Sequence, residues 1–338
     1  MEPSKKNRVT LLQVAEHAGV SRSTASLIVR NSPAISNATR EKVLASMKEL
    51  GYVYDRIAAN LRSQHSTTIG IIITDIANTF FSDLLIGINE ELEMGGYTGL
   101  LGTTFDLVSK QEQLISTMLE HRVGGIILVP VSGSGQDTVE RLQKLDIPVV
   151  LAVRELPEND FDYVGFDYIL GAEMAVTHLI DKGHKRIAFI GGRAESLTWT
   201  ERMEGYHAIH SKYGLIVDDL LVLPGPITKN AGAEAVQELI KRSGDNLPTA
   251  IFCFSDLVAF GVILGLRQVG LTPGEDIEVV GFDNVPESEI VHPPLTTVSS
   301  FARLTGAEAA RLLQKRLTNS GLKAERILIE PELIVRDF

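Results

Sequence analysis

From Ser66 onward the sequence alternates short, nearly continuous apolar runs with amphipathic stretches, and this alternation limits the possible fold more than any other feature. The apolar runs form two sets of four, at 69–74, 97–102, 124–130 and 148–153, and at 186–192, 219–225, 249–255 and 277–283. Strands that are apolar on both faces belong to parallel sheets that helices cover on each side. The pattern therefore predicts an α/β core of two similar parallel-sheet lobes. A ligand of such a fold binds beyond the carboxyl ends of the strands, which here is the crevice between the lobes.

The first 51 residues instead carry three short helical patterns. Each pattern follows a hydroxyl residue that is suited to a helix N-cap, and glycine ends the first and the third. The caps and glycines are Thr10, Gly19, Ser21, Ser36 and Gly51. A tight turn between two such helices is typical of a helix-turn-helix, in which residues 21–30 would be the helix that reaches base edges in a major groove. The alternative is a solvated three-helix cap that binds no DNA.

The charge distribution separates this helical segment from the rest of the chain. The net charge of the whole chain is −11, which by itself argues against a nucleic-acid-binding protein. Residues 1–65, however, carry ten Lys or Arg and five Asp or Glu, a net charge of +5, whereas residues 66–338 carry 22 and 38, a net charge of −16. A basic end on an acidic body is expected when only that end meets DNA or a membrane, and the helical pattern favours DNA.

Longer sequence blocks carry a resemblance that extends through nearly the whole chain. They are VTLLQVAEHAGVSRSTASLIVRN, ISNATREKVLASMKELGYVYDRIAANLR, TIGIIITDIANTFF, VGGIILVP, HLIDKGHKRIAFIGG, TERMEGY, FCFSDLVAFGV, VVGFDNV and HPPLTTV. In this order they resemble the lactose-repressor (LacI/GalR) family of transcription regulators, and SLTWTER with Leu27 is most similar to the MalI-type maltose-regulon subgroup. The resemblance implies a helix-turn-helix headpiece that binds a palindromic operator in double-stranded DNA. It also implies a type-I periplasmic-binding-protein-like core, switched by a small-molecule effector such as a sugar, and repression as the usual outcome.

The helical pattern and the resemblance together predict the residues that contact DNA. They are Thr10, Leu11, Ser21, Arg22, Ser23, Thr24, Ser26, Leu27, Arg30, Asn31, Arg56 and Leu61. Arg22 could bond a guanine through two hydrogen bonds. Leu61, in a short hinge helix predicted from Arg56 to Leu61, matches the leucine that in relatives wedges into the minor groove, where the cost of unstacking is offset by contacts with bent DNA. Its alternative role is to pack the hinge helix against the partner subunit.

Three positions depart from the family pattern, namely Gln13, Leu27 and Asp55. Leu27 cannot donate a hydrogen bond to a base, although it could touch a thymine methyl group. We therefore expect an operator preference that differs from that of the best-known members. Asp55 stands at the start of the predicted hinge helix.

The resemblance also implies the effector site. The matching positions are Phe80, Phe81, Asp167, Ser196, Thr198, Trp199, Arg202, Ile227, Asp256 and Asp283. Aromatic faces suit the C–H patches of a sugar ring, while Arg and Asp suit its paired hydroxyls. Arg202 and Asp283 are expected at strand–helix junctions that face the crevice. The alternatives are a core position for one phenylalanine, a surface or core position for Trp199, and a helix-capping role for Asp256.

Motifs for catalysis and cofactors are absent from the sequence. The stretch SGSGQD at 132–137 lacks the third glycine of a dinucleotide site, and there is no phosphate-binding loop and no nucleophile with a base. His207 and His210 share a helix face without a third metal ligand. We expect no catalytic residue, no metal and no cofactor. Two other classes stay open: a periplasmic-type sugar-binding protein, which would need a signal peptide and no headpiece, and a sugar-modifying enzyme.

The remaining features concern location and assembly. The N-terminal segment lacks the apolar core of a signal peptide, no apolar run could span a membrane, and the single cysteine, Cys253, lies in an apolar run. These features predict a cytoplasmic protein with a buried thiol. The end of the sequence carries no apolar heptads, so we expect a homodimer. The expected domains are a headpiece at 1–51, a hinge linker at 52–65 and a core at 66–338, with lobe one at about 66–162 and 293–321 and lobe two at about 163–292 and 322–338.

Overall fold

The computed structural model describes residues 9–29, 32–53, 66–319 and 321–336. They belong to two compact units, residues 1–65 and residues 66–338, called here the helical unit and the sheet unit. Within the described residues no helix is long and apolar enough to cross a membrane.

The helical unit contains the three predicted helices: α1 (Leu11–Ala18), α2 (Arg22–Val29) and α3 (Asn37–Leu50). The predicted caps are confirmed, because Thr10 accepts a hydrogen bond from the backbone of Gln13 and Ser36 accepts one from Thr39. Gly19 and Gly51 end α1 and α3 with φ of 63° and 65°, the left-handed conformation that glycine adopts without strain.

A small apolar core holds the three helices together. Its buried residues are Val14, Ala15, Ala18, Ala25, Ile28 and Val43. They recur at helical spacing, so each helix turns one stripe inward and leaves the rest of its surface to solvent. The first turn of α2 belongs to this solvent-facing surface.

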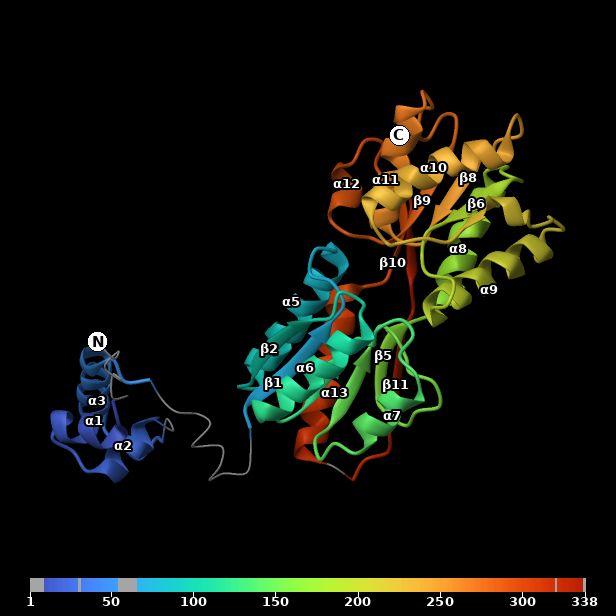
Figure 1. Ribbon diagram of the computed structural model, residues 1–338. Helices are drawn as coiled ribbons and strands as arrows, with labels where there is room; N and C mark the ends of the chain where they lie inside the picture. The colour runs from blue at the N-terminus through green and yellow to red at the C-terminus, as the bar shows by residue number, and fades with distance from the viewer. Residues whose placement is uncertain (1–8, 30–31, 54–65, 320, 337–338) are drawn as a thin grey trace, which may run out of the picture. The chain divides into compact units, whose positions relative to one another are not determined.

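The sheet unit contains two sheets of six strands each, and the chain passes between them (Figure 1). The first sheet is entirely parallel, in the order β11-β5-β4-β3-β1-β2. Its strands are β1 (Thr68–Ile73), β2 (Thr98–Thr103), β3 (Ile126–Leu128), β4 (Val149–Ala152), β5 (Asp162–Phe166) and β11 (Arg326–Ile329). Helices α5 (Thr79–Met94) and α13 (Ala302–Thr318) cover one face, and α6 (Val108–Glu120) and α7 (Gln136–Gln143) cover the other.

The second sheet has the order β12-β10-β9-β8-β6-β7, and only its edge strand β12 is antiparallel. Its strands are β6 (Ile187–Ile190), β7 (Val222–Leu223), β8 (Ala250–Cys253), β9 (Glu278–Asp283), β10 (Thr296–Ser299) and β12 (Glu332–Ile334). Helices α8 (Tyr168–Asp181) and α9 (Leu197–Lys212) cover one face. The other face carries α10 (Lys229–Ser243) and α11 (Asp256–Gln268), and η1 (Asp219–Leu221) and α12 (Glu287–Ile290) lie in connections.

The two α/β lobes are confirmed, but their extent differs from the prediction. Each sheet has six strands instead of four, because β5 and β11 join the first sheet, β10 and β12 join the second, and none of these four strands lies in a predicted apolar run. The lobe boundaries predicted near 162, 293 and 322 were also wrong, since β5 and β11 belong to the first sheet and β10 to the second. The sequences of β5 and β10, DYVGF and TTVS, include polar residues and therefore do not form apolar runs. The hydrogen-bond partners of these polar residues lie far along the chain.

Candidate functional site

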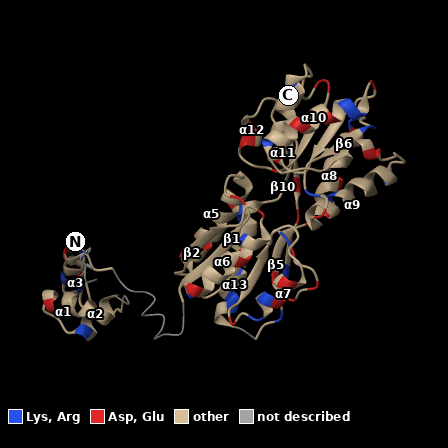
Figure 2. Ribbon diagram, in the orientation of Figure 1, with Lys and Arg blue, Asp and Glu red and all other residues tan. Residues whose placement is uncertain are grey.

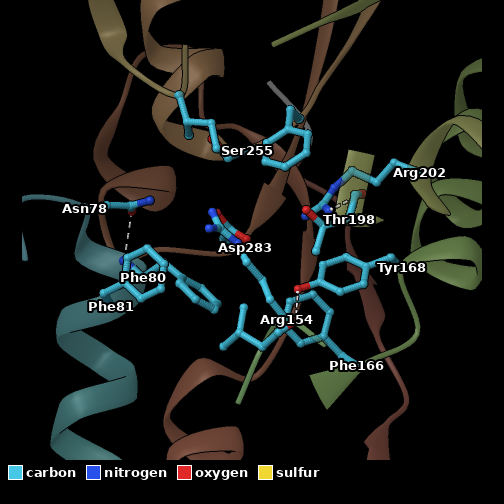
Figure 3. Close-up of a pocket in the computed structure, with 13 residues that line it drawn as sticks. Asn78, Phe80, Phe81, Arg154, Phe166, Tyr168, Thr198, Arg202, Ser255 and Asp283 are labelled. Carbon is cyan, nitrogen blue, oxygen red and sulfur yellow. Dashed lines mark hydrogen bonds between the residues drawn. The ribbon is translucent and has the colours of Figure 1, made fainter. Parts of the chain in front are cut away.

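A cavity of the sheet unit lies at the carboxyl ends of strands from both sheets (Figure 3). Its empty volume is about 380 Å³, including the part that opens to solvent. The lining residues are Asn78, Phe80, Phe81, Val153, Arg154, Phe166, Tyr168, Thr198, Arg202, Ile227, Phe254, Ser255 and Asp283. This is the crevice in which parallel α/β sheets bind their ligands.

Aromatic rings form the apolar wall of the cavity. Asn78 caps α5 by accepting a hydrogen bond from the backbone of Phe80, and so fixes the turn that carries Phe80 and Phe81. The centroids of these two rings are 5.0 Å apart, and Phe80 lies 6.2 Å from Phe166. Phe166 in turn lies 4.3 Å from Tyr168. Rings arranged in this way offer flat faces to an apolar side of a ligand.

Arg202, in the second turn of α9, is the buried cation of the cavity. Its guanidinium carbon lies 4.4 Å, 4.2 Å and 4.1 Å from the ring centroids of Tyr168, Phe254 and Phe282. Nη1 donates to the carbonyl of Thr198 at 2.9 Å, while Nε is buried without a hydrogen-bond partner. Burial lowers the pKa of this guanidinium from its usual value, but an arginine stays charged in a protein. A donor left unpaired in an aromatic box is prepared for an acceptor on a ligand.

Asp283, at the end of β9, brings a carboxyl group to the same cavity. Its φ of 120° lies in a region that side-chain-bearing residues rarely adopt, and such strain concentrates at functional sites. Burial raises the pKa of this carboxyl well above its usual value; the neighbouring Asp256 adds to the rise and Arg202 opposes it. Asp283 and Arg202, which both lie in the described part of the chain, form no ion pair within 4.0 Å of each other. Both groups therefore remain available to a ligand.

Arg154 adds a second guanidinium. It follows β4 directly after Val153, whose φ of 67° is a strained conformation for a β-branched residue. Its Nη1 donates to Asp106 Oδ1 at 2.7 Å and to the carbonyl of Pro130 at 3.2 Å. Burial raises the pKa of Asp106, but Arg154 and the backbone N–H of Ser132 outweigh it, so this pKa lies below its usual value. The ionised carboxylate holds Arg154 at the edge of the cavity.

Of the ten effector positions predicted from the sequence, the structure brings six together in this cavity. They are Phe80, Phe81, Thr198, Arg202, Ile227 and Asp283. Both phenylalanines are buried and also line the cavity, so each is a core residue and a cavity residue at the same time. Arg202 lies within α9 instead of at a strand–helix junction.

The other four predicted positions do not line the cavity. Asp167 and Ser196 cap α8 and α9. Trp199 packs against the core, where its Nε1 is buried without a hydrogen-bond partner. These side chains position the helices that carry Tyr168 and Arg202.

Asp256, the fourth of them, is fully buried behind the cavity. Its carboxylate accepts hydrogen bonds from the Val285 backbone at 2.9 Å, the Ser288 hydroxyl at 2.7 Å and the Thr297 hydroxyl at 2.5 Å. The capping alternative was also wrong, because Ser255 caps α11. Burial raises the pKa of Asp256 to about 6, against the lowering effect of these hydrogen bonds. Asp256 ties α11 to the segment that follows β9 and to β10.

Seven lining residues were not predicted: Asn78, Val153, Arg154, Phe166, Tyr168, Phe254 and Ser255. Four of them end, or directly follow, apolar runs that were recognised as strands. The carboxyl-end position of such residues was a usable signal. Phe166 and Tyr168 gave none, because β5 itself was missed.

The candidate DNA surface of the helical unit begins at α2. Ser21, Arg22 and Ser23 are exposed, and Arg22 forms no ion pair with another described residue. Leu27 is 39% exposed on the same helix. The departure at Gln13 has a structural role, since its side chain accepts a hydrogen bond from the Thr10 backbone at 2.8 Å and completes a capping box.

Only some of the remaining predicted DNA contacts lie in the described part of the chain. Leu11, Thr24 and Ser26 are half-buried, and Thr10 is exposed. Arg30, Asn31, Arg56 and Leu61, together with Asp55, lie outside the described residues. On the sheet unit, basic and acidic positions are interspersed over both lobes (Figure 2).

Comparisons with known proteins agree with both units. The family model of bacterial regulatory proteins of the lacI family matches residues 10–55, and that of the periplasmic binding protein-like domain matches residues 176–337. The chain is 39% identical to catabolite control protein A of Priestia megaterium over 309 residues, which cover 91% of this chain and 92% of that protein. A solved CelR–cellobiose complex is similar with a TM-score of 0.73 at 32% identity, covering 97% of this chain and 99% of that one. A lac repressor dimer bound to operator and the anti-inducer ONPF has a TM-score of 0.84 at 26% identity, covering 97% and 98%.

Proposed function

The chain belongs to the lacI family of bacterial regulatory proteins and is a DNA-binding transcription regulator, not an enzyme, and from this premise we propose that it is a repressor switched by a sugar. The helical unit binds a palindromic operator in double-stranded DNA, and the cavity of the sheet unit binds the effector. Two copies form a homodimer, so that each helical unit reads one half-site. The cytoplasm is the compartment in which such a protein meets its operator.

The cavity is the observation that carries this proposal. It combines aromatic faces with the guanidinium of Arg202, the carboxyl of Asp283 and the hydroxyls of Thr198 and Ser255. Sugars require this mixture, because their C–H faces pack on rings while their hydroxyls both donate and accept hydrogen bonds. The cellobiose held by a similar regulator supports the same ligand class.

Specific contacts with DNA are assigned to the start of α2. Arg22 offers paired donors to a guanine, and the neighbouring Ser21 and Ser23 can bond bases or phosphates. The residues that lie outside the described part, Leu61 among them, stay predictions from the sequence. The same holds for the division into a headpiece at 1–51, a linker at 52–65 and a core at 66–338.

The effector acts by favouring one arrangement of the sheet unit over another. A ligand that contacts both lobes binds the closed cavity better than the open one, and this difference in affinity is the free energy available to alter DNA binding. A coupling of about 1–3 kcal/mol gives a change in operator affinity of roughly fivefold to 150-fold.

The test is selection of DNA sequences by the full-length protein, followed by a carbohydrate screen on the selected DNA. We expect a palindromic consensus, and an affinity for it that at least one carbohydrate changes tenfold or more. Selection of no consensus would contradict the DNA role. If a consensus is found but no carbohydrate alters binding to it, the DNA-binding role stands and the sugar effector is wrong.

A further inference from the structure

One ion pair joins the two lobes of the sheet unit. Nε of Arg193, in the lobe of the second sheet, lies 3.5 Å from Oδ2 of Asp106, in the lobe of the first sheet. All other ion pairs within 4.0 Å among the described residues of the sheet unit join two side chains of the same lobe. In this part of the chain, opening of the crevice therefore has to break this ion pair and no other.

Asp106 is held firmly in the lobe of the first sheet. It follows β2 in a turn where Phe105 and Asp106 have φ of 50° and 56°, a left-handed conformation that bulky residues avoid and that persists only where neighbouring contacts fix it. Arg154 donates to Oδ1 at 2.7 Å, and Ser132 donates from its backbone at 3.0 Å and from its hydroxyl. The side chain is 18% exposed, and Oδ2 faces Arg193. The first lobe thus presents a fixed carboxylate to the second.

Arg193 lies in the segment between β6 and α9 and is attached to the start of that helix. Its carbonyl accepts a hydrogen bond at 2.8 Å from the hydroxyl of Ser196, the residue that caps α9. Its side chain is 48% exposed and forms no ion pair with any other described residue. A movement of Arg193 is therefore a movement of the helix that carries Thr198 and Arg202.

The ion pair stands outside the effector cavity but is connected to both of its sides. Neither Asp106 nor Arg193 lines the cavity. Asp106 holds Arg154, which lines it from the first lobe (Figure 3). Arg193 precedes α9, which lines it from the second. The pair therefore depends on the separation of the two cavity walls and not on contact with a ligand.

We propose that Asp106 and Arg193 form a latch that favours the closed arrangement of the two lobes before any effector binds. Both are positioning residues. A ligand that requires the closed cavity binds with an apparent affinity reduced by the fraction of molecules that are closed, so the latch raises this affinity for any effector. Partly exposed ion pairs shift an equilibrium by up to about fivefold. The inference goes beyond the proposed function, because it holds whether or not the effector is a sugar.

The test is the distance between the lobes, measured by double electron–electron resonance on the full-length protein without effector. Spin labels at Gln113→Cys of α6 and His207→Cys of α9 report this distance, because both positions are exposed and Cys253 is buried. Labelled protein is diluted with unlabelled protein, so that the two labels of one chain are measured.

Removal of the charge on either side should open the crevice. We expect Arg193→Gln and Asp106→Asn each to increase the population with a longer distance roughly twofold to fivefold. Raising the KCl concentration from about 0.05 M to 0.5 M should have the same effect on the unmodified pair and little effect on Arg193→Gln, because salt screens an exposed pair. A purely structural role of Arg193 would not give this dependence on salt.

Two control variants separate the latch from a general effect of charge. Arg193→Lys keeps the positive charge and should keep the short distance. Arg242→Gln removes an arginine that is 39% exposed and paired with Glu238 of its own helix, and it should leave the distance unchanged. Equal distances in the unmodified protein, Arg193→Gln and Asp106→Asn would overturn the proposal. An opening by Arg242→Gln as large as that by Arg193→Gln would overturn it as well.

Discussion

The helical unit and the sheet unit present their candidate functional side chains in opposite ways. In the helical unit the described candidates lie between Thr10 and Leu27, and Arg22 with its neighbours is exposed on one short helix. In the sheet unit the cavity is lined by separate segments between Asn78 and Asp283, and most of these side chains are buried. A DNA-reading surface thus depends on local sequence, whereas an effector site depends on where two sheets bring the ends of their strands together.

Removal of residues 1–65 should have the largest effect and separate the two units completely. We expect the remaining sheet unit to lose specific operator binding by a thousandfold or more, since specific sites exceed non-specific DNA by roughly this factor. Its affinity for the effector should stay within twofold, because every cavity residue is retained. Gel shift and calorimetry on the truncated and full-length proteins measure both. Specific operator binding by the truncated protein would contradict the assignment of DNA binding to residues 1–65.

The two neighbouring carboxyl groups of the sheet unit should differ in what they support. Asp256→Ala leaves the buried partners of three hydrogen bonds unsatisfied, and we expect the free energy of unfolding to fall by about 3–5 kcal/mol. Asp283→Asn should leave stability within about 1 kcal/mol, since burial already disfavours its charge, but abolish the effector response. Urea denaturation of the two variants measures both changes in the free energy of unfolding. Equal losses of stability would place Asp283 in the scaffold instead of the site.

These two carboxyl groups also show what the sequence could not predict. The caps at Thr10, Ser36 and Gly51 were predictable because each depends on residues within a few positions. The role of Asp256 depends on Thr297, which is 41 residues away and lies in β10, a strand without an apolar run. No local pattern contains such a pair.

Strand β5 was missed for the same reason. It begins with Asp162, which is buried because Arg316 of α13 donates to both of its carboxylate oxygens. An acidic residue whose partner is 154 positions away suggests a loop when only its neighbours are considered. Missing β5 also hid Phe166 and Tyr168, so the prediction of the aromatic wall was incomplete.

Exchanging one arginine in each unit should produce separate losses of binding. Arg22→Ala removes paired donors to a base, and we expect operator affinity to fall roughly tenfold to 100-fold with the effector affinity unchanged. Arg202→Met keeps apolar volume among three rings but removes the charge, and effector affinity should fall by a similar factor. Each binding curve serves as the control for the other variant. A loss of both activities in either variant would break the comparison.

The smallest expected effect is a pH dependence confined to the sheet unit. Burial raises the pKa of Asp256 from 3.8 to about 6, so between these values the native state holds more protons than the unfolded state. Asp256 should therefore lower the free energy of unfolding by about 1–2 kcal/mol as the pH rises from 4.5 to 6. Asp283 and Glu201, whose pKa values burial also raises, act in the same direction. Burial raises the pKa of Glu278, but its contacts with His178, His184 and Lys182 outweigh burial and hold this pKa below 4.5, so Glu278 acts in the opposite direction, mostly below that pH.

The fluorescence of Trp199 follows this transition, because it is the single tryptophan and lies in the sheet unit. Asp256→Asn, which cannot ionise, is the control, and its free energy of unfolding should fall less between pH 4.5 and 6 than that of the unmodified chain. A stability that rises over this interval would contradict the assignment to Asp256.

The most direct test of a regulator whose two units communicate is the affinity of the full-length protein for its selected operator, measured by fluorescence anisotropy with and without a saturating concentration of the carbohydrate that the screen selects. We predict that this carbohydrate changes the operator Kd at least tenfold for the unmodified chain. For Asp283→Asn the Kd should match that of the unmodified chain without sugar and stay unchanged when sugar is added. An operator Kd that responds equally in both proteins, or in neither, would contradict an effector site at the end of β9.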